Sequence, residues 1–369
     1  MLEREPVGLV TYRHDRPASA IDEYSRHLVR ALRDGGIPAG YEDGGLDAVL
    51  RRAARPRWVL LQYNPLSYAR WGFAPALVRD AISLRRRWPR TPLVVTVHEP
   101  WVAIRDWRSA LMSAYQRVQL RSLLRVSDGV IVVRETLARE LGYACAHVPV
   151  GSNITPIAVS GTAARVRLGI EGKLVVALFG TAHESRALDH AEAAIAQLAA
   201  RRRADRLCVL ALGRDSPTPT HPSGVEVRTP GSLASAELSL HLRASDILLL
   251  PFTDGLSTRR TTLMAGLAHG LPVLGLRGVN TDRVLVRDAG AMVMTPCGDL
   301  GAYARAAVQL MDDPARLRAV GDAGRRLYER SFDWPVVARM TVAALRGSDR
   351  RRTGAPTSRS AGWPSSHPA

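Results

Sequence analysis

Three features are scarce or absent in this chain of 369 residues, and each absence excludes a class of protein. Cysteine occurs only as Cys145, Cys208 and Cys297, whose wide, odd-numbered spacing fits neither a disulfide framework nor a metal site and indicates a reducing compartment. No stretch approaches 18 consecutive apolar residues, which argues against a membrane-spanning helix. The first residues also lack the charged and then apolar pattern of a signal peptide. We therefore expect a cytoplasmic protein.

Lysine is almost absent as well: Lys173 is the only one, so arginine carries the net charge of +17. Such a bias is typical of a GC-rich coding sequence, which weakens a functional interpretation of the arginine total. The distribution is more informative, because the span 51–125 contains fifteen arginines and only three acidic residues. A cationic face there suits nucleic acid, anionic lipid or a phosphorylated substrate, and a solvated basic helix surface is the alternative.

The order of elements predicts an α/β protein of two domains, which the length also favours. Short apolar runs alternate with amphipathic segments, as in parallel sheets flanked by helices. The predicted strands are 7–12, 58–63, 93–97, 129–133, 174–179, 207–212, 225–228 and 247–250, and another begins at 273. The predicted helices are 21–33, 75–87, 111–126, 136–141, 188–199, 235–243, 261–268, 302–311, 314–328 and 336–345. The polar segment 347–369, rich in Pro, Ser and Arg, is expected to be disordered.

The segment 245–276 is the most informative stretch, because a buried strand, a cationic loop and a helix follow one another in it. The loop and the first helical turn contain Ser257, Arg259, Arg260, Thr261 and Thr262. Ligands of open α/β sheets bind outside the carboxyl ends of the strands, where helix N-termini and arginine forks suit phosphate. We therefore expect an anion site, and the alternative is a solvated basic loop.

A second candidate site follows the strand predicted at 93–97, which ends at His98 and Glu99. A histidine at the carboxyl end of a parallel strand lies where ligands bind. A lone histidine is nevertheless more often structural than catalytic.

The run 244–273, ASDILLLPF…GLSTRRTTLMAGLAHGLPV, resembles the donor-site segment of the retaining GT-B glycosyltransferases of family 4. The family's ending A-x-G-x-P-V is present as Ala268–Val273, and Ser331–Trp334 is similar to its F-S-W motif before the last helix. Both glutamates of the family's E-x7-E pair are missing, and Ser257 and Ala265 occupy their positions. The chain thus resembles a variant branch in which arginines take up the donor-phosphate contacts.

The resemblance implies a GT-B fold, in which two Rossmann-like domains face each other across a cleft. It places an acceptor-side domain at 1–155 and a nucleotide-sugar donor domain at 156–346, whose last helix crosses back to the first domain, followed by the disordered tail. The implied activity, of the hexosyltransferase class, moves a sugar from a nucleotide-diphosphate sugar to an acceptor with retention. Polysaccharide, glycolipid or glycoconjugate synthesis is the implied context, with no cofactor and no metal.

The resemblance also implies roles for individual residues. His98 and Glu99 match an H-E pair that faces the transferred sugar, so they are the catalytic candidates. The implied donor-binding residues are Gly180, Arg186, Gly231, Ser257, Arg259, Arg260, Thr261 and Thr262. Without a metal, fixed cations and helix N-termini must stabilise the leaving diphosphate. We therefore expect Arg186, Arg259 and Arg260 to converge on one diphosphate site.

The expected partners are a nucleotide-sugar donor and an unidentified acceptor, which in relatives is often lipid-linked, but no nucleic acid. Peripheral contact with the inner face of the membrane is expected at Arg85, Arg86 and Arg87 beside the aromatic Trp88. Two rival hypotheses stand beside this one. The first is a non-catalytic GT-B protein that binds a sugar nucleotide or a partner. The second is a nucleic-acid-binding protein that uses the basic 51–125 surface.

Overall fold

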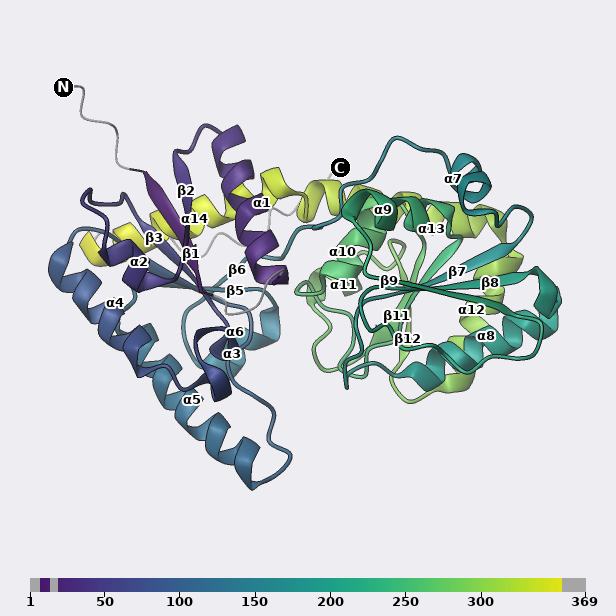
Figure 1. Cartoon of the computed structure of the whole chain (residues 1–369), viewed down its shortest axis with the longest axis horizontal. Helices are drawn as coiled ribbons and strands as arrows, with labels where there is room; N and C mark the ends of the chain where they lie inside the picture. The colour runs from purple at the N-terminus through teal and green to yellow at the C-terminus, as the bar shows by residue number, and fades with distance from the viewer. Residues whose placement is uncertain (1–6, 14–18, 354–369) are drawn as a thin grey trace, which may run out of the picture. The chain divides into compact units, whose positions relative to one another are not determined.

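The computed structural model describes residues 7–13 and 19–353, which form two compact units (Figure 1). The first unit comprises Met1–Val133, Leu137–Val148 and Ala338–Ala369, and the second comprises Arg134–Thr136 and Pro149–Val337. Each unit contains one six-stranded sheet whose neighbouring strands are all parallel. Helix α14 (Trp334–Thr353) contains the point where the chain leaves the second unit and rejoins the first.

The sheet of the first unit has the strand order β2-β1-β3-β4-β5-β6. Its strands are β1 (Gly8–Tyr12), β2 (Ala39–Asp43), β3 (Val59–Tyr63), β4 (Leu93–Val97), β5 (Gly129–Val132) and β6 (Ala146–His147). Its helices, besides the end of α14, are α1 (Ala20–Asp34), α2 (Leu46–Leu50), α3 (Pro65–Tyr68), α4 (Pro75–Arg87), α5 (Trp107–Val126) and α6 (Glu135–Leu141). The first two residues of α6 belong to the second unit. Strands β1, β3 and β4 are buried at every residue, as expected of apolar strands covered on both faces.

The sheet of the second unit has the strand order β12-β11-β10-β7-β8-β9. Its strands are β7 (Leu174–Phe179), β8 (Leu207–Leu212), β9 (Glu226–Gly231), β10 (Ile247–Leu250), β11 (Val273–Arg277) and β12 (Val293–Pro296). Its helices are α7 (Gly161–Leu168), α8 (Leu188–Arg202), α9 (Ser235–Ala244), α10 (Thr261–Ala268), α11 (Arg283–Arg287), α12 (Leu300–Asp312) and α13 (Pro314–Ser331). Helices α8 and α12 cover one face of this sheet, and α10 packs on the other (Figure 1).

The strand order of the second unit positions its candidate site. Strands β7, β10 and β11 are neighbours at the centre of the sheet and run in the same direction. Their carboxyl ends, and the loops that follow them, therefore lie at one edge, where ligands of open α/β sheets bind.

Several predicted elements are confirmed to the residue, namely β4, β7, β8, β10, α4 and α10. Elements with weak apolar patterns were missed: β2 contains a glycine and two acidic residues, and α7 buries only Ala164. The strand predicted at 225–228 extends further along the chain, because β9 ends at Gly231. The disordered tail was expected to begin at Gly347, but α14 continues to Thr353, because arginine favours a helix and no proline interrupts it. Residues 354–369 of that tail lie outside the described residues.

Candidate functional site

Three loops of the second unit meet at the carboxyl edge of its sheet. The loop after β7 contacts the loop after β10 through a hydrogen bond from the Thr253 amide to the Ser185 carbonyl oxygen, 2.8 Å long. The loop after β10 contacts the loop after β11 through a 2.8 Å hydrogen bond from the backbone N–H of Asn280 to the backbone carbonyl oxygen of Asp254. Side chains that are far apart in the sequence are thereby brought to one place.

Arg186 and Arg260, which come from different loops, lie against the same aromatic ring. The guanidinium carbon of Arg260 is 3.9 Å from the centre of the Phe252 ring, and that of Arg186 is 5.8 Å from it. Both distances are within the range of a cation–π contact. The two guanidinium groups can therefore be no farther apart than the sum of these distances, so the structure brings them together.

Asp254 holds the two adjacent arginines in place. Its Oδ1 accepts a 2.6 Å hydrogen bond from Arg260. Its Oδ2 accepts two hydrogen bonds of 3.1 Å, one from Arg259 and one from the side-chain nitrogen of Asn280. Burial alone would raise the pKa of Asp254, but the two arginines and the bond from Asn280 outweigh burial and hold that pKa below its ordinary value. The cluster of Arg186, Arg259, Arg260 and Asp254, called the arginine cluster below, thus has three positive charges against one negative charge.

Two side chains of the loop after β7 hold Arg260 in its orientation through hydrogen bonds. Arg260 donates a 3.1 Å hydrogen bond to the Ser185 hydroxyl, which lies 2.7 Å from Nδ1 of His183. The Ser185 backbone N–H also donates to this Nδ1, so Nδ1 is an acceptor and the hydroxyl donates to it. Burial lowers the pKa of Arg186, whose guanidinium donates to the Phe179 carbonyl oxygen. An arginine nevertheless stays charged at neutral pH.

The N-terminus of α10 lies beside this cluster. A Cβ placed on Gly180 would lie 2.7 Å from Arg186 and 3.2 Å from Thr262, the second residue of α10, and φ at Gly180 is +122°. Only glycine fits that position, so the chain after β7 passes directly against the helix start. Arg260 is the N-cap residue of α10, and its side chain forms no capping hydrogen bond. The first backbone N–H groups of the helix, which include those of Thr261 and Thr262, are therefore not capped by that side chain.

Two buried hydroxyls at this site lack a partner. Ser257 is fully buried, and its hydroxyl finds no hydrogen-bond partner among the described residues. The Thr262 hydroxyl is also buried and also has no hydrogen-bond partner among the described residues. An unsatisfied buried polar group costs about 1–3 kcal/mol, so native structures seldom keep one without a ligand or water. Unsatisfied hydroxyls beside a cationic cluster and a helix N-terminus are suited to a polar anionic ligand.

A buried carboxylate that the sequence did not single out fixes the end of the cationic loop. Asp282 is fully buried, and its Oδ2 accepts from the backbone N–H of Thr258 at 2.6 Å and from the Thr258 hydroxyl at 2.7 Å. Its Oδ1 accepts a 2.6 Å bond from the backbone N–H of Glu135, in the segment Arg134–Thr136 of the same unit. Asn280 accepts a 3.0 Å bond from Arg134.

Some of these missed residues carried a signal in the sequence. Asn280 and Asp282 lie in the loop after the strand that was predicted to begin at 273, at the edge where ligands bind. Asp254 precedes Gly255, where φ is +87° and a Cβ would lie 2.4 Å from the Gly278 nitrogen, so two loops pack closely there. Arg134 gave no such signal, because it is distant in the sequence from the loops that it contacts.

Gly231 is the predicted donor residue that the structure leaves apart from the arginine cluster. It ends β9 with φ at +75°, and a Cβ placed there would meet no described atom within 4 Å. It pairs with Leu212 of β8, so it lies at the same carboxyl edge of the sheet. Its role in binding a donor stays a prediction.

The first unit places His98 directly after β4, at the carboxyl edge of its own sheet. His98 is buried; its Nε2 lies 2.7 Å from the Gln62 side-chain oxygen and its ring meets Tyr24 edge-on at 5.2 Å. Because a carbonyl oxygen only accepts, Nε2 carries the proton and Nδ1 is the acceptor. Burial lowers the pKa of His98 to about 3, so the ring is neutral at physiological pH.

Beside His98, the buried side-chain nitrogen of Gln62 lacks a hydrogen-bond acceptor among the described residues. Gln62 is fully buried, and its Nε2 has no hydrogen-bond partner among the described residues. It presents two donors beside the neutral imidazole of His98. Glu99, the other catalytic candidate, is half-buried and follows directly.

The predicted membrane contact at residues 85–88 is wrong in its details. Trp88 is only 8% exposed, and the guanidinium of Arg87 covers its ring at 4.7 Å. Arg87 also donates to two backbone carbonyl oxygens, and Arg85 forms a 2.7 Å ion pair with Asp128. The sequence could not show this, because consecutive residues of a helix point in different directions. Arg86 is exposed to solvent.

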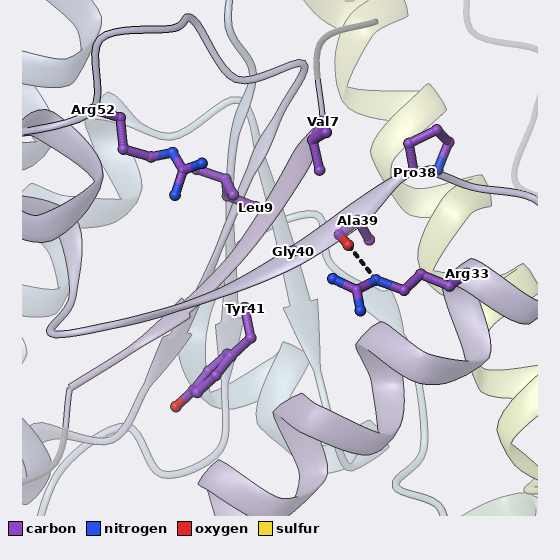
Figure 2. A pocket seen from close by; sticks show the side chains of 8 residues that line it. All are labelled: Val7, Leu9, Arg33, Pro38, Ala39, Gly40, Tyr41 and Arg52. Carbon is purple, nitrogen blue, oxygen red and sulfur yellow. Dashed lines mark hydrogen bonds between the residues drawn. The ribbon is translucent and has the colours of Figure 1, made fainter. Parts of the chain in front are cut away.

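Another pocket of the first unit, of about 460 Å³, lies at the opposite ends of the strands (Figure 2). It is lined by Val7, Leu9, Arg33, Pro38, Ala39, Gly40, Tyr41 and Arg52. Its two arginines are engaged: Arg33 donates to the Ala39 carbonyl oxygen at 2.7 Å, and Arg52 pairs with Glu42 at 2.6 Å. This pocket is therefore a weaker candidate than the carboxyl edges. Within residues 7–13 and 19–353, no group of His, Cys, Asp or Glu could hold a metal ion, and no helix is long and apolar enough to cross a membrane.

Comparison with known proteins identifies relatives that share part of the sequence. No model of a known protein family matches the chain. The chain is 25% identical over 268 residues to the MMP alpha-(1->4)-mannosyltransferase of Mycolicibacterium hassiacum, covering 68% of this chain and 64% of that protein. It is 30% identical over 240 residues to the D-inositol 3-phosphate glycosyltransferase of Kineococcus radiotolerans, covering 55% and 54%. The chain thus spans less than two thirds of the length of either relative.

Solved structures match nearly the whole chain. Sucrose-phosphate synthase from Thermosynechococcus elongatus is similar with a TM-score of 0.68 and 17% identity, over 93% of this chain and 98% of that one. HepE of Anabaena, solved in complex with UDP and glucose, is similar with a TM-score of 0.64 and 12% identity, over 92% and 99%. Together with the two six-stranded parallel sheets, these similarities show that the chain has the GT-B fold of two Rossmann-like α/β domains, as glycosyltransferase structures do.

Proposed function

We propose that this chain is a glycosyltransferase that moves a sugar from a nucleotide-diphosphate sugar to an acceptor hydroxyl with retention. The observation that carries the proposal is that Arg186 and Arg260 both contact the Phe252 ring, beside the N-terminus of α10. Two curated relatives are named as sugar transferases, and a structural relative was solved with UDP and glucose, which supports a sugar nucleotide as the ligand.

In the proposed reaction, the bond between the anomeric carbon and the terminal diphosphate oxygen breaks. The acceptor oxygen forms a new bond to that carbon on the same face, and its proton leaves with the diphosphate. The departing diphosphate gains negative charge, so the barrier falls if fixed cations and N–H groups already point at it. The arginine cluster and the first N–H groups of α10 are suited to this task without reorganisation.

The proposed role of His98 is to contact the transferred sugar. A ring that is neutral at physiological pH is not suited to exchange protons there, but its Nδ1 can accept a hydrogen bond from a sugar hydroxyl. The unpartnered amide nitrogen of Gln62 can donate to the same group. Glu99 is the neighbouring carboxylate that we propose to complete this site.

We further propose that the acceptor is lipid-linked and that the product is a glycolipid, a polysaccharide or another glycoconjugate. The strongly basic first unit supports this, since anionic lipid attracts clustered arginine. A non-catalytic protein that binds a sugar nucleotide is the second candidate. One observation favours it: Ser257 and Ala265 stand where the family that the sequence resembles has two glutamates, and both side chains are fully buried.

Nucleotide release from a panel of UDP-, GDP-, ADP- and dTDP-sugars tests the proposal, with a total lipid extract as the acceptor source. Release that depends on the acceptor extract, together with an unchanged anomeric configuration in the product by NMR, is the expected result. Tight donor binding without release would favour the non-catalytic alternative. Neither binding nor release with any donor would contradict both.

A further inference from the structure

Exposed apolar side chains of the described residues are concentrated on one part of the first unit. Of the twelve large hydrophobic residues that are exposed, eight lie between residues 66 and 118. These are Leu66, Trp71, Phe73, Ile82, Ile104, Trp107, Leu111 and Val118. Single exposed hydrophobic residues are ordinary, but a group on neighbouring elements marks an interaction surface.

Helices α4 and α5 pack side by side (Figure 1). Side chains of both helices line an apolar groove of about 780 Å³. The apolar residues that line it include Phe73, Val78, Ile82, Leu111 and Val118. On α5 this lining continues one turn earlier as Trp107, which is 72% exposed, because residues four apart share a helix face. The groove with its flanking exposed residues is called the α4–α5 surface below.

Positive charge accompanies this apolar surface. Arg79 and Arg86 line the groove, and Arg79 also forms a 3.1 Å ion pair with the neighbouring Asp80. Arg108 lies 5.3 Å from the Trp107 ring, and Arg70 lies 5.7 Å from the Trp71 ring. Residues 66–126 contain eleven arginines against Asp80, Glu99 and Asp106. The surface therefore combines exposed tryptophan and aliphatic side chains with four arginines, namely Arg70, Arg79, Arg86 and Arg108.

We propose that the α4–α5 surface docks onto an anionic lipid bilayer, which deepens the proposed function by naming where the chain would meet a lipid-linked acceptor. Tryptophan and aliphatic residues suit the boundary between headgroups and acyl chains, and arginines beside them suit lipid phosphates. Protein interfaces are also enriched in tryptophan and arginine, so the choice of a bilayer rests on the arginines together with the proposed lipid-linked acceptor. Charge complementarity and the proposed acceptor together favour an anionic membrane as the occupant.

Vesicle co-sedimentation, without donor, tests the proposal. The wild-type chain is compared on phosphatidylcholine vesicles and on vesicles that also contain phosphatidylglycerol, and binding to the anionic vesicles is expected to be stronger. An apolar variant carries Trp107→Ser, Leu111→Ser and Val118→Ser, and a charge variant carries Arg79→Gln, Arg86→Gln and Arg108→Gln. Each arginine near an anionic surface is worth about fivefold in partitioning, so the charge variant should bind about a hundredfold more weakly. The apolar variant should lose at least about tenfold.

A control variant changes exposed residues of the second unit in the same way: Val166→Ser, Arg316→Gln and Arg318→Gln. It should bind anionic vesicles as the wild type does. Equal binding to neutral and anionic vesicles, no binding to either, or full binding by both surface variants would overturn the proposal. A dimer in sedimentation equilibrium that the apolar variant abolishes would also overturn it, because a second copy would then be the occupant.

Binding of nucleoside diphosphates by the same variants separates this inference from the proposed function. All three variants should bind the nucleotide as the wild type does, because none of the substituted residues belongs to the arginine cluster. Vesicle binding with no affinity for any nucleoside diphosphate would contradict the proposed function alone. The reverse result would contradict only the membrane surface.

Discussion

Replacing Arg260 with alanine should weaken nucleoside diphosphate binding far more than replacing an exposed arginine elsewhere. Arg260 is fixed by a 2.6 Å bond to Asp254, a 3.1 Å bond to Ser185 and a 3.9 Å ring contact, so little entropy remains to be lost on binding. A hydrogen bond to a charged group contributes about 1.5–3 kcal/mol. Its loss should raise the dissociation constant by a factor of about 10 to 150, since 1.4 kcal/mol corresponds to tenfold. Calorimetric titration with UDP, GDP, ADP and dTDP measures this.

Two further variants separate binding from folding. Arg260→Lys keeps the positive charge but removes the planar fork, and it should lose about tenfold in affinity. Arg316→Ala, at an exposed position of α13, is the matched control and should bind normally. Asp254 keeps its bonds from Arg259 and Asn280 in the alanine variant, so the melting temperature should fall only moderately. Unchanged affinity in a folded Arg260→Ala protein would refute the assignment of the arginine cluster to phosphate.

The remaining predictions concern catalysis, stability and pH. His98→Ala should lower kcat about 10- to 100-fold with little change in the donor dissociation constant, as for a contact made mainly in the transition state, and full activity would contradict that role. Asp282→Ala removes three hydrogen bonds from a fully buried carboxylate and should cost about 3 kcal/mol of unfolding free energy, measured by denaturant titration with Asp322→Ala as the control. Burial, followed by repulsion from Arg243 and Arg325, outweighs the bond to the Ala265 carbonyl oxygen and lowers the pKa of His269 to about 4. As the pH falls, the unfolded chain takes up the His269 proton at a higher pH than the folded chain does. The contribution of His269 to the free energy of unfolding is therefore complete above pH 6.5, and that free energy should fall by about 2 kcal/mol by pH 5. A His269→Gln variant should lack this decline, and an equal pH dependence in both proteins would contradict it.

The fold could be predicted to a large extent, because the signals are local. The run 247–250 is apolar and bounded by proline, and the helix 261–268 ends at glycine and proline, so both elements were placed to the residue. Segments such as β2 and α7 lack a clear apolar period, since an edge strand or a surface helix buries little. Their structure depends on tertiary contacts that local patterns do not encode.

The candidate site was only partly predictable. The position of Arg259 and Arg260 before a helix was enough to expect an anion site, and the strand order then brought Arg186 to the same place. The role of Asp254 in holding both arginines was missed, because it depends on a loop conformation that only the packing of Gly255 against Gly278 defines. The predicted membrane residues 85–88 were wrong for a related reason: sequence proximity suggested a patch, whereas the structure buries Trp88 and pairs Arg85 with Asp128.

We propose that the arginine cluster and the start of α10 hold the donor diphosphate. A crystal structure with a bound nucleoside diphosphate tests it most directly. We expect phosphate oxygens within about 2.7–3.2 Å of the guanidinium nitrogens of Arg186 and Arg260 and of the backbone nitrogens of Thr261 and Thr262. A diphosphate bound elsewhere, with Arg260 still directed only at Asp254 and Ser185, would contradict it.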